Sequence, residues 1–533
     1  MPPSALRSHL LSPLQLLVVG IAGALSLPLF YVLYKAGTAE VAIWGRLWRT
    51  RLPELLWNTF SLGTGVAMMT LILGVSLAWL VTRVEFPGRR IWEWALVLPL
   101  AMPTYVLAYV YSYLLALSGP IDQLWQAVWG PDSHVFAPQS LWGATIVMGL
   151  DTFPFVYLLT RAALLNSNMS YEEVARACGV GPWSTFLRVT LPLLRPSIFA
   201  GVSLVVLYVV SDFGAVSLLR FQTLTYAVYQ QMTGRYNYAA ASVLSLLLVV
   251  FAILFFVAER WFRQRSRFYQ TGGRFRATVP TRGPLATRIA TLVFVITIFL
   301  LSFGVPAALL IGWSADALSA GLLDPRFFEF TWNTILLSGL AATAAVILGL
   351  PVAFLATRRP TWLNQLCLQA TYAGYVLPGP VAALALLVLA MAVVPSWYGT
   401  VILLILAYVV HYLPAGLQSL EPAIQQVTPN VEEVARTLGL NVWKTLQRVT
   451  LPLIWNGFVG AWILMFLQCM KELPATLLLR PVGFDTLAVR VWLEASEELY
   501  QLAAAPALLI VILSLPALGL LVARDWRSRE RMS

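Results

Sequence analysis

Long apolar segments separated by short polar ones constrain this chain more than any other feature. A helix that crosses a bilayer needs about 20 mainly apolar residues. About twelve segments qualify, and they lie near 13–34, 58–82, 95–117, 141–160, 197–218, 241–259, 286–312, 333–357, 367–393, 397–414, 456–479 and 502–523. Only 11% of the 533 residues are charged, against roughly 25% in a soluble domain. We therefore predict an all-α integral membrane protein with about 12 transmembrane helices.

The positive charge is distributed as membrane topology requires. The net charge is +11, and with the N-terminus inside, about 25 of the 35 Lys and Arg residues fall on the cytoplasmic side. We therefore expect both termini to be cytoplasmic, although Arg46, Arg49 and Arg51 depart from the pattern. No nucleic-acid-binding motif accompanies the charge, so we expect no nucleic-acid partner. The first segment is too long for a removable signal peptide and lacks its cleavage site.

Landmarks recur in the same order along the chain and indicate an internal repeat. Trp57-Asn58-Thr59 and Trp332-Asn333-Thr334 each open an apolar segment and lie 275 residues apart. Leu98-Pro99 and Leu377-Pro378 follow, 279 residues apart. A stretch rich in Arg, Gly and Thr lies between the two sets and is predicted to be a cytoplasmic linker.

The repeat predicts two tandem halves of six helices each, with parallel pseudo-symmetry about the membrane normal. The predicted bounds are 1–262 for the first half, 263–284 for the linker and 285–533 for the second half, with repeated transmembrane domains at about 58–259 and 333–523.

Two polar segments, which we call the first elbow (172–193) and the second elbow (432–453), align without a gap 260 residues apart. Each begins with two glutamates, which favour the positive end of a helix dipole. A glycine then permits a turn, and a second short helix is expected to start at Pro182 or after Asn441. We expect Pro192 and Pro196 to break this second helix before the next span.

Each elbow carries a tryptophan, Trp183 or Trp443, that would suit a groove on a partner protein. An amphipathic loop lying on the membrane surface would explain one such segment. Two copies with matched spacing favour a duplicated docking site on the cytoplasmic side.

The spacing Glu173-x-Ala175-x-x-x-Gly179, repeated from Glu433 onward, resembles the EAA signature of type I permease subunits of bacterial ABC importers. Val174 and Val434 depart from the alanine that is frequent in that family. The resemblance implies that each elbow docks on one of two copies of a cytoplasmic ABC ATPase, which bind ATP and Mg. The implied coupling residues are Glu172, Glu173, Ala175, Gly179, Trp183, Pro192, Glu432, Glu433, Ala435, Gly439, Trp443 and Pro452.

Longer runs are similar to fused, two-half ferric iron permeases. They span 98–103, 211–214 and 470–487. This resemblance implies a multi-pass protein of the bacterial inner membrane that moves Fe³⁺ delivered by a periplasmic ferric-iron-binding protein. Thiamine, sulfate, or another anion or metal remains an alternative cargo.

Two carboxylates, Asp212 and Glu472, also lie 260 residues apart, near the outer part of a predicted span. A carboxylate at that depth usually faces a cavity, and its oxygens suit a hard cation such as Fe³⁺. We therefore predict that both line the translocation path and contact passing iron transiently. Alternatively, Glu472 pairs with Lys471 or Arg480, and Asp212 caps a helix break. The scattered Cys and His residues predict no stably bound metal.

The chain contains no G-x-x-x-x-G-K-[ST] motif and no grouping typical of covalent catalysis, so we predict neither enzyme activity nor a cofactor of its own. Energy would come from another subunit. A secondary transporter driven by an ion gradient is the first rival, but it gives no reason for two matched elbows. A membrane enzyme or scaffold is the second.

Overall fold

The computed structural model describes residues 13–167, 170–265, 280 and 282–530. Every element assigned in these ranges is a helix, so the all-α prediction is confirmed. The predicted linker, 263–284, lies largely outside them. Nine described helices are long and apolar enough to cross a membrane: Pro13–Gly37, Leu52–Arg83, Leu141–Leu165, Trp183–Ser211, Tyr238–Phe255, Leu285–Ser319, Phe327–Arg358, Val401–Gln426 and Gln447–Met470.

Three predicted spans, 95–117, 367–393 and 502–523, have no counterpart among these nine described helices, and four predicted spans contain a break. The predicted span 95–117 contains a 92° bend between Arg89–Ala101 and Thr104–Leu114. Met102, before Pro103, is extended with ψ 129°, because proline disfavours a helical residue before it. Leu377, before Pro378, is extended in the same way and divides 367–393. The segments 197–218 and 456–479 break at Asp212 and Glu472.

The chain forms two compact units, and each takes helices from both predicted halves. The first-elbow unit comprises Arg46–Ala227, Val250–Leu323 and Val491–Ser533. Its elements are α3 (Leu52–Arg83), α4 (Arg89–Ala95), η1 (Leu98–Ala101), α5 (Thr104–Leu114), α6 (Pro120–Trp129), α7 (Leu141–Leu165), α8 (Ser170–Ala177), α9 (Pro182–Thr185), η2 (Phe186–Thr190), α10 (Leu191–Ser211), α11 (Gly214–Leu218), α14 (Leu285–Phe299), η3 (Leu300–Gly304), α15 (Val305–Ser319) and α25 (Tyr500–Glu530).

The second-elbow unit comprises Met1–Gly45, Val228–Val249 and Asp324–Arg490. Its elements are α1 (Pro13–Gly37), α16 (Phe327–Arg358), α17 (Trp362–Val376), α18 (Gly379–Val393), η4 (Pro395–Trp397), α19 (Val401–Gln426), α20 (Pro429–Thr437), α21 (Val442–Thr445), η5 (Leu446–Thr450), α22 (Leu451–Met470) and α23 (Pro474–Leu479). The chain passes from one unit to the other five times: between α15 and α16, at Leu323–Asp324, and within α2 (Val41–Thr50), α12 (Leu224–Thr233), α13 (Tyr238–Arg265) and α24 (Leu487–Ser496).

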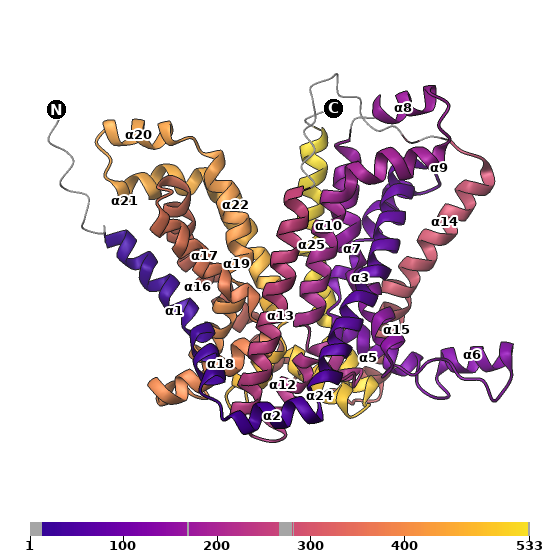
Figure 1. The fold of residues 1–533 in the computed structure, drawn as a ribbon, viewed down its shortest axis with the longest axis horizontal. Coiled ribbons are helices and arrows are strands. Elements are labelled where there is room, and N and C mark those ends of the chain that lie inside the picture. The colour runs from indigo at the N-terminus through magenta and orange to yellow at the C-terminus, as the bar shows by residue number, and fades with distance from the viewer. Residues whose placement is uncertain (1–12, 168–169, 266–279, 281, 531–533) are drawn as a thin grey trace. The chain divides into compact units, whose positions relative to one another are not determined.

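Glycines let the central helices of the first-elbow unit approach closely. A Cβ on Gly74 of α3 would lie 2.7 Å from the Val156 side chain of α7, and one on Gly201 of α10 would lie 2.8 Å from the Val156 Cα. Small residues at such crossings are typical of helices packed within a bilayer. Figure 1 shows α8 and α9 at one end of α3, α7 and α10, and α5 and α6 at the other end.

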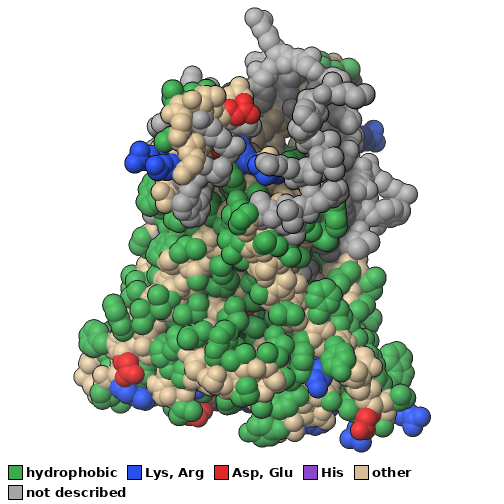
Figure 2. Space-filling view, turned by 90° about the vertical axis from the view of Figure 1, so that its left-hand side faces the viewer, with side chains coloured by type: hydrophobic (Ala, Val, Ile, Leu, Met, Phe, Trp, Pro, Cys, Tyr) green, Lys and Arg blue, Asp and Glu red, His purple; other side chains and the backbone are tan. Residues whose placement is uncertain are grey.

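The outer surface of the spans suits lipid. On α16, Leu336, Leu340 and Ile347 are exposed while Leu337 and Ala341 are buried. Figure 2 shows a broad band of hydrophobic side chains, with the Lys, Arg, Asp and Glu side chains gathered at the two edges of the face. Apolar residues that face outward on long helices are expected where the bilayer is the solvent.

Candidate functional site

The first elbow folds as a helix, a glycine turn and a second helix. Helix α8 ends with the Val180 N–H donating to the Ala175 carbonyl at 3.1 Å, and Gly179 takes a φ of +81°. This is the pattern by which a left-handed glycine closes a helix C-terminus. The predicted turn at Gly179 is therefore confirmed.

The second elbow repeats these contacts. Gly439 has a φ of +89°, and the Leu440 N–H donates to the Ala435 carbonyl at 3.2 Å. Asn441 caps the next helix, because its Oδ1 accepts from the Lys444 N–H at 2.8 Å. The second helix is therefore capped by Asn441, as predicted.

The prediction that Pro192 and Pro196 break the second helix is wrong. A five-residue π-helical segment, η2, joins α9 to α10, and the Leu191 N–H donates to the Phe186 carbonyl five residues earlier. The wider π turn removes the need for a donor at Pro192, which stands at the start of α10. The second elbow has the same π-helical segment, η5, before Pro452.

The two glutamates that open each elbow have opposite environments. Glu172 and Glu432 are buried, with 7% and 4% of their surface exposed, whereas Glu173 and Glu433 are exposed. Neighbouring residues on a helix point about 100° apart, so one carboxylate can face inward while the next faces outward.

The buried glutamate of the first elbow joins three elements through one oxygen. Glu172 Oε1 lies 2.6 Å from Nη2 of Arg83, the last residue of α3. The same Oε1 accepts a hydrogen bond from the Thr190 hydroxyl at 2.8 Å. We call Arg83, Glu172 and Thr190 the first clamp.

The second clamp consists of Arg358, Glu432 and Thr450. Glu432 Oε1 lies 2.9 Å from Nη2 of Arg358, the last residue of α16, and accepts from the Thr450 hydroxyl at 3.2 Å. Both clamps thus connect an elbow helix, the end of a long span and the start of the following span.

The remaining predicted coupling residues occupy the elbows as follows. Trp183 is 70% exposed and stacks on Phe186 with ring centroids 5.6 Å apart. Trp443 lies in α21, and its side chain falls outside the described part of the structure. Ala175 is half-buried and Ala435 is buried.

Asp212 and Glu472 lie at helix breaks, not within continuous spans as predicted. Asp212 follows α10, and its Oδ1 accepts from the Ala215 N–H of α11 at 2.8 Å. Its Oδ2 accepts from the Thr104 hydroxyl at 2.6 Å. Glu472 follows α22, and its Oε1 accepts from the Ala475 N–H of α23 at 3.0 Å. Both carboxylates therefore cap the short helix that follows them.

Tyr412 donates a second hydrogen bond to Glu472. Arg480, one of the predicted alternative partners of Glu472, pairs with Asp485. The helix-capping alternative is therefore correct for Asp212, and the carboxylate of Glu472 has the same role. Whether either residue also contacts cargo stays a prediction.

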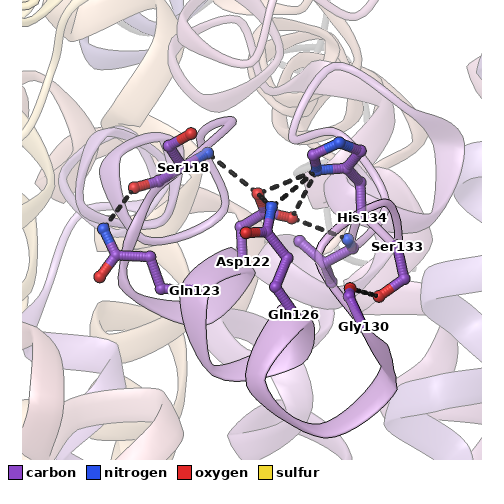
Figure 3. Close-up of polar contacts among 8 residues, drawn as sticks. Ser118, Asp122, Gln123, Gln126, Gly130, Ser133 and His134 are labelled. Atoms are coloured by element: carbon purple, nitrogen blue, oxygen red, sulfur yellow. Dashed lines mark hydrogen bonds and ion pairs between the residues drawn. The ribbon is translucent and has the colours of Figure 1, made fainter.

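A buried carboxylate that sequence reasoning missed organises the loop between α5 and α7. Asp122 of α6 is 1% exposed. It accepts from the Ser118 and Val135 N–H groups at 2.9 and 3.0 Å and from Gln126 Nε2 at 2.9 Å. His134 Nδ1 lies 3.1 Å from Oδ2 (Figure 3). The hydrogen bond from Ser118, with those from Val135 and His134, lowers the pKa of Asp122 below its ordinary value.

Sequence reasoning also missed the basic and hydroxyl members of the clamps. Arg83 and Arg358 were visible as the ends of two repeated segments 275 residues apart, and Thr190 and Thr450 recur at 260 residues. A systematic comparison of polar residues at these spacings would have selected them.

The chain matches the model of the family described as binding-protein-dependent transport system inner membrane component, over residues 70–268 and 345–528. It is 32% identical to the Fe(3+)-transport system permease protein FbpB 2 of Haemophilus influenzae, over 94% of this chain and 96% of the relative. The putative ferric transport system permease protein FbpB 1 of the same organism is 24% identical, over 84% and 73%.

A probable sulfate transport system permease protein, cysT of Nephroselmis olivacea, is 30% identical over 39% of this chain and 74% of the relative. The extent of the family match and of the first relative shows that this chain belongs to the family of binding-protein-dependent inner membrane transport components. Its several apolar helices agree with a protein that crosses that membrane more than once.

Proposed function

We propose that this chain is the permease subunit of a bacterial ABC importer for ferric iron. A periplasmic ferric-iron-binding protein delivers the cargo, and two copies of a cytoplasmic ATPase, which hold ATP and Mg, dock on the elbows. The halves 1–262 and 285–533 are the repeated permease domains, and both termini are cytoplasmic. The observation that carries the proposal is the duplicated elbow: two segments far apart in sequence reproduce the same turn, π-helical segment and clamp.

The elbow surface supports ATPase docking at the exposed residues. Glu173, Glu433 and Trp183 are exposed on short helices, where a partner can reach them. Gly179 and Gly439 set the angle between the two helices of each elbow, because other residues rarely adopt their positive φ. Energy then enters the chain from the partner, and this chain has no catalytic role.

Uptake of radioactive iron into proteoliposomes that contain this chain, its ATPase and the binding protein tests the proposal. We expect uptake to follow ATP supplied on the ATPase side and to continue when an ionophore dissipates the proton gradient. Uptake that follows the proton gradient without ATP would identify a secondary transporter instead.

Sulfate is the second candidate cargo, because sulfate permeases are among the relatives. Those relatives match only part of the chain, 39% in the case above, whereas a ferric relative matches 94%. Competition between radioactive iron and sulfate in the same proteoliposomes separates the two. We expect iron to accumulate and excess sulfate to leave that uptake unchanged.

We further propose that Asp212 and Glu472 contact passing Fe³⁺ with their oxygens. Asp212→Asn with Glu472→Gln removes both charges but keeps an oxygen that can accept the capping N–H. A purely structural cap therefore predicts normal uptake. A path residue predicts reduced iron uptake with unchanged co-purification of the ATPase.

A further inference from the structure

Each clamp buries the carboxylate of a glutamate, and removing a charged group from water costs free energy. A buried ion pair adds little stability over well-packed apolar residues, yet both copies retain one. What a charged hydrogen bond adds is a fixed distance and direction. In both clamps the same atom, Oε1, receives the Arg and the Thr, so the geometry is reproduced to the atom.

Each clamp contacts the end of one long helix and the start of a span that ends at a helix break. In the first-elbow unit, Arg83 is the end of α3 and Thr190 immediately precedes α10. Helix α10 runs from the clamp to Asp212, its C-cap. One continuous helix therefore joins Thr190 of the clamp to the break at Asp212.

The far end of α3 is attached to the segment just beyond the same break. Asn58 Nδ2 donates to the Gln222 carbonyl at 3.0 Å, and the Leu224 N–H donates to the Thr59 hydroxyl at 3.0 Å. The 32 residues of α3 cover about 48 Å at 1.5 Å per residue. Helices α3 and α10 therefore link the clamp to the two sides of the break at Asp212.

The second-elbow unit repeats the far attachment as well. Asn333 Nδ2 donates to the Asp485 carbonyl at 3.1 Å, and the Leu487 N–H donates to the Thr334 hydroxyl at 2.9 Å. Helix α22 runs from Thr450 to the break at Glu472. Each long helix, α3 or α16, is thus held by polar contacts at both of its ends.

We propose that Glu172 and Glu432 are positioning residues that transmit elbow movement to the helix breaks at Asp212 and Glu472. Each carboxylate holds two spans at once, so an ATPase that displaces the elbow moves both sides of the break together. This inference rests on the proposed function, in which the exposed side of the elbow receives the ATPase. The buried glutamates then act on transport and not on docking.

The test measures iron imported per ATP hydrolysed in proteoliposomes that contain the complete transporter. The ratio is taken only on complexes that contain the ATPase, and for Glu172→Gln with Glu432→Gln we expect iron per ATP to fall about tenfold. An unchanged ratio overturns the inference. If the wild-type chain shows no ATP-dependent uptake or binds no ATPase, the proposed function itself fails.

Two further sets of variants separate transmission from folding. Glu172→Asp with Glu432→Asp keeps the charge but shortens the side chain, so it cannot span both partners and should lower the ratio as well. Arg83→Lys with Arg358→Lys keeps a charged donor and should retain most of the iron imported per ATP.

Glu85→Gln is the matched control, because the Glu85–Arg282 pair is an acid–arginine contact in the same unit as the first clamp but is exposed. A fall of the ratio in the control equal to that in the clamp variants would contradict the inference.

Discussion

The two elbows resemble each other more closely than some other equivalent parts of the two units do. Both clamps use Arg, Glu and Thr with the same atoms in contact. Close to the elbows, 11 residues before Glu172 and before Glu432, the chemistry of the two copies differs. Arg161 of α7 pairs with Glu93 of α4, whereas Glu421 of α19, 260 residues later, accepts a hydrogen bond from Tyr372 of α17 at 2.8 Å.

The loops beyond the opposite ends of the helices differ more strongly. Between α5 and α7 the first-elbow unit has α6 and the Asp122 cluster. Between α18 and α19 the second-elbow unit has a short connection with η4. The copies therefore stay alike at the elbows, at the far ends of α3 and α16 and at the capped breaks. They differ at the links made by Arg161 and Glu421 and in these loops. Two identical ATPase copies would require two matching elbows. A cargo and its single binding protein would not require matching loops at the other end.

The largest effect is expected from the contrast between Arg161 and Glu421, measured as the loss of stability when each is replaced. Arg161→Ala leaves the carboxylate of Glu93, whose side chain is 14% exposed, without its partner, and removal of one member of a buried pair costs about 3–5 kcal/mol. Glu421→Gln keeps an acceptor for Tyr372 and should cost about 1 kcal/mol or less. Thermal unfolding of the purified variants in detergent measures both.

The exposed Arg220–Glu498 pair supplies the control, because Arg220→Ala should leave the unfolding temperature nearly unchanged. Equal destabilisation by Arg161→Ala and Glu421→Gln would contradict the contrast drawn between the two links.

The elbows should respond equally to loss of their glycines. Gly179→Ala and Gly439→Ala should each lower the stability of the elbow by about 1–2 kcal/mol, because alanine adopts the left-handed backbone conformation less readily than glycine. A Cβ at either position meets nothing within 4 Å. Hydrogen exchange in the elbow segments measures the local loss. Gly181→Ala, which also meets nothing and has no positive φ, should be neutral, and unequal effects in the two copies would show that their environments differ.

The smallest and most local effect is expected at Asp122, in the loop between α5 and α7 that differs from the short connection between α18 and α19. The pKa of Asp122 is lowered in the folded loop, so the carboxylate stabilises the loop above the ordinary Asp pKa of about 3.9. That stabilisation is lost as the pH falls from there through the lowered pKa. Asp122→Asn should therefore speed hydrogen exchange of residues 118–135 at pH 7, with no change in the elbows.

The same experiment near pH 3 supplies the control. There the wild-type loop should exchange more nearly like the Asp122→Asn loop once intrinsic exchange rates are corrected for pH. A difference between them that widens at low pH would show that Asp122 acts through something other than its charge.

Much of the elbow could be predicted from the residues themselves. Gly179, Gly439 and Asn441 determine local backbone geometry, and local geometry depends on few neighbours. The broken spans were missed because the apolar character of a segment does not show whether the chain bends or the helix ends within it. Pro192 was misread for a related reason: a proline breaks a regular α-helix, but the π-helical segment before it removes the conflict.

The sequence alone determined that the chain is a helical membrane protein, that it is a tandem repeat, and where its elbows lie. These properties follow from the lengths and spacings of apolar and polar segments, which can be read along one dimension. The tertiary structure decided which glutamate of each pair is buried, which arginine and threonine meet it, and that Asp212 and Glu472 cap helix breaks. Such contacts join residues up to 108 positions apart, and their choice depends on how helices rotate and pack in three dimensions.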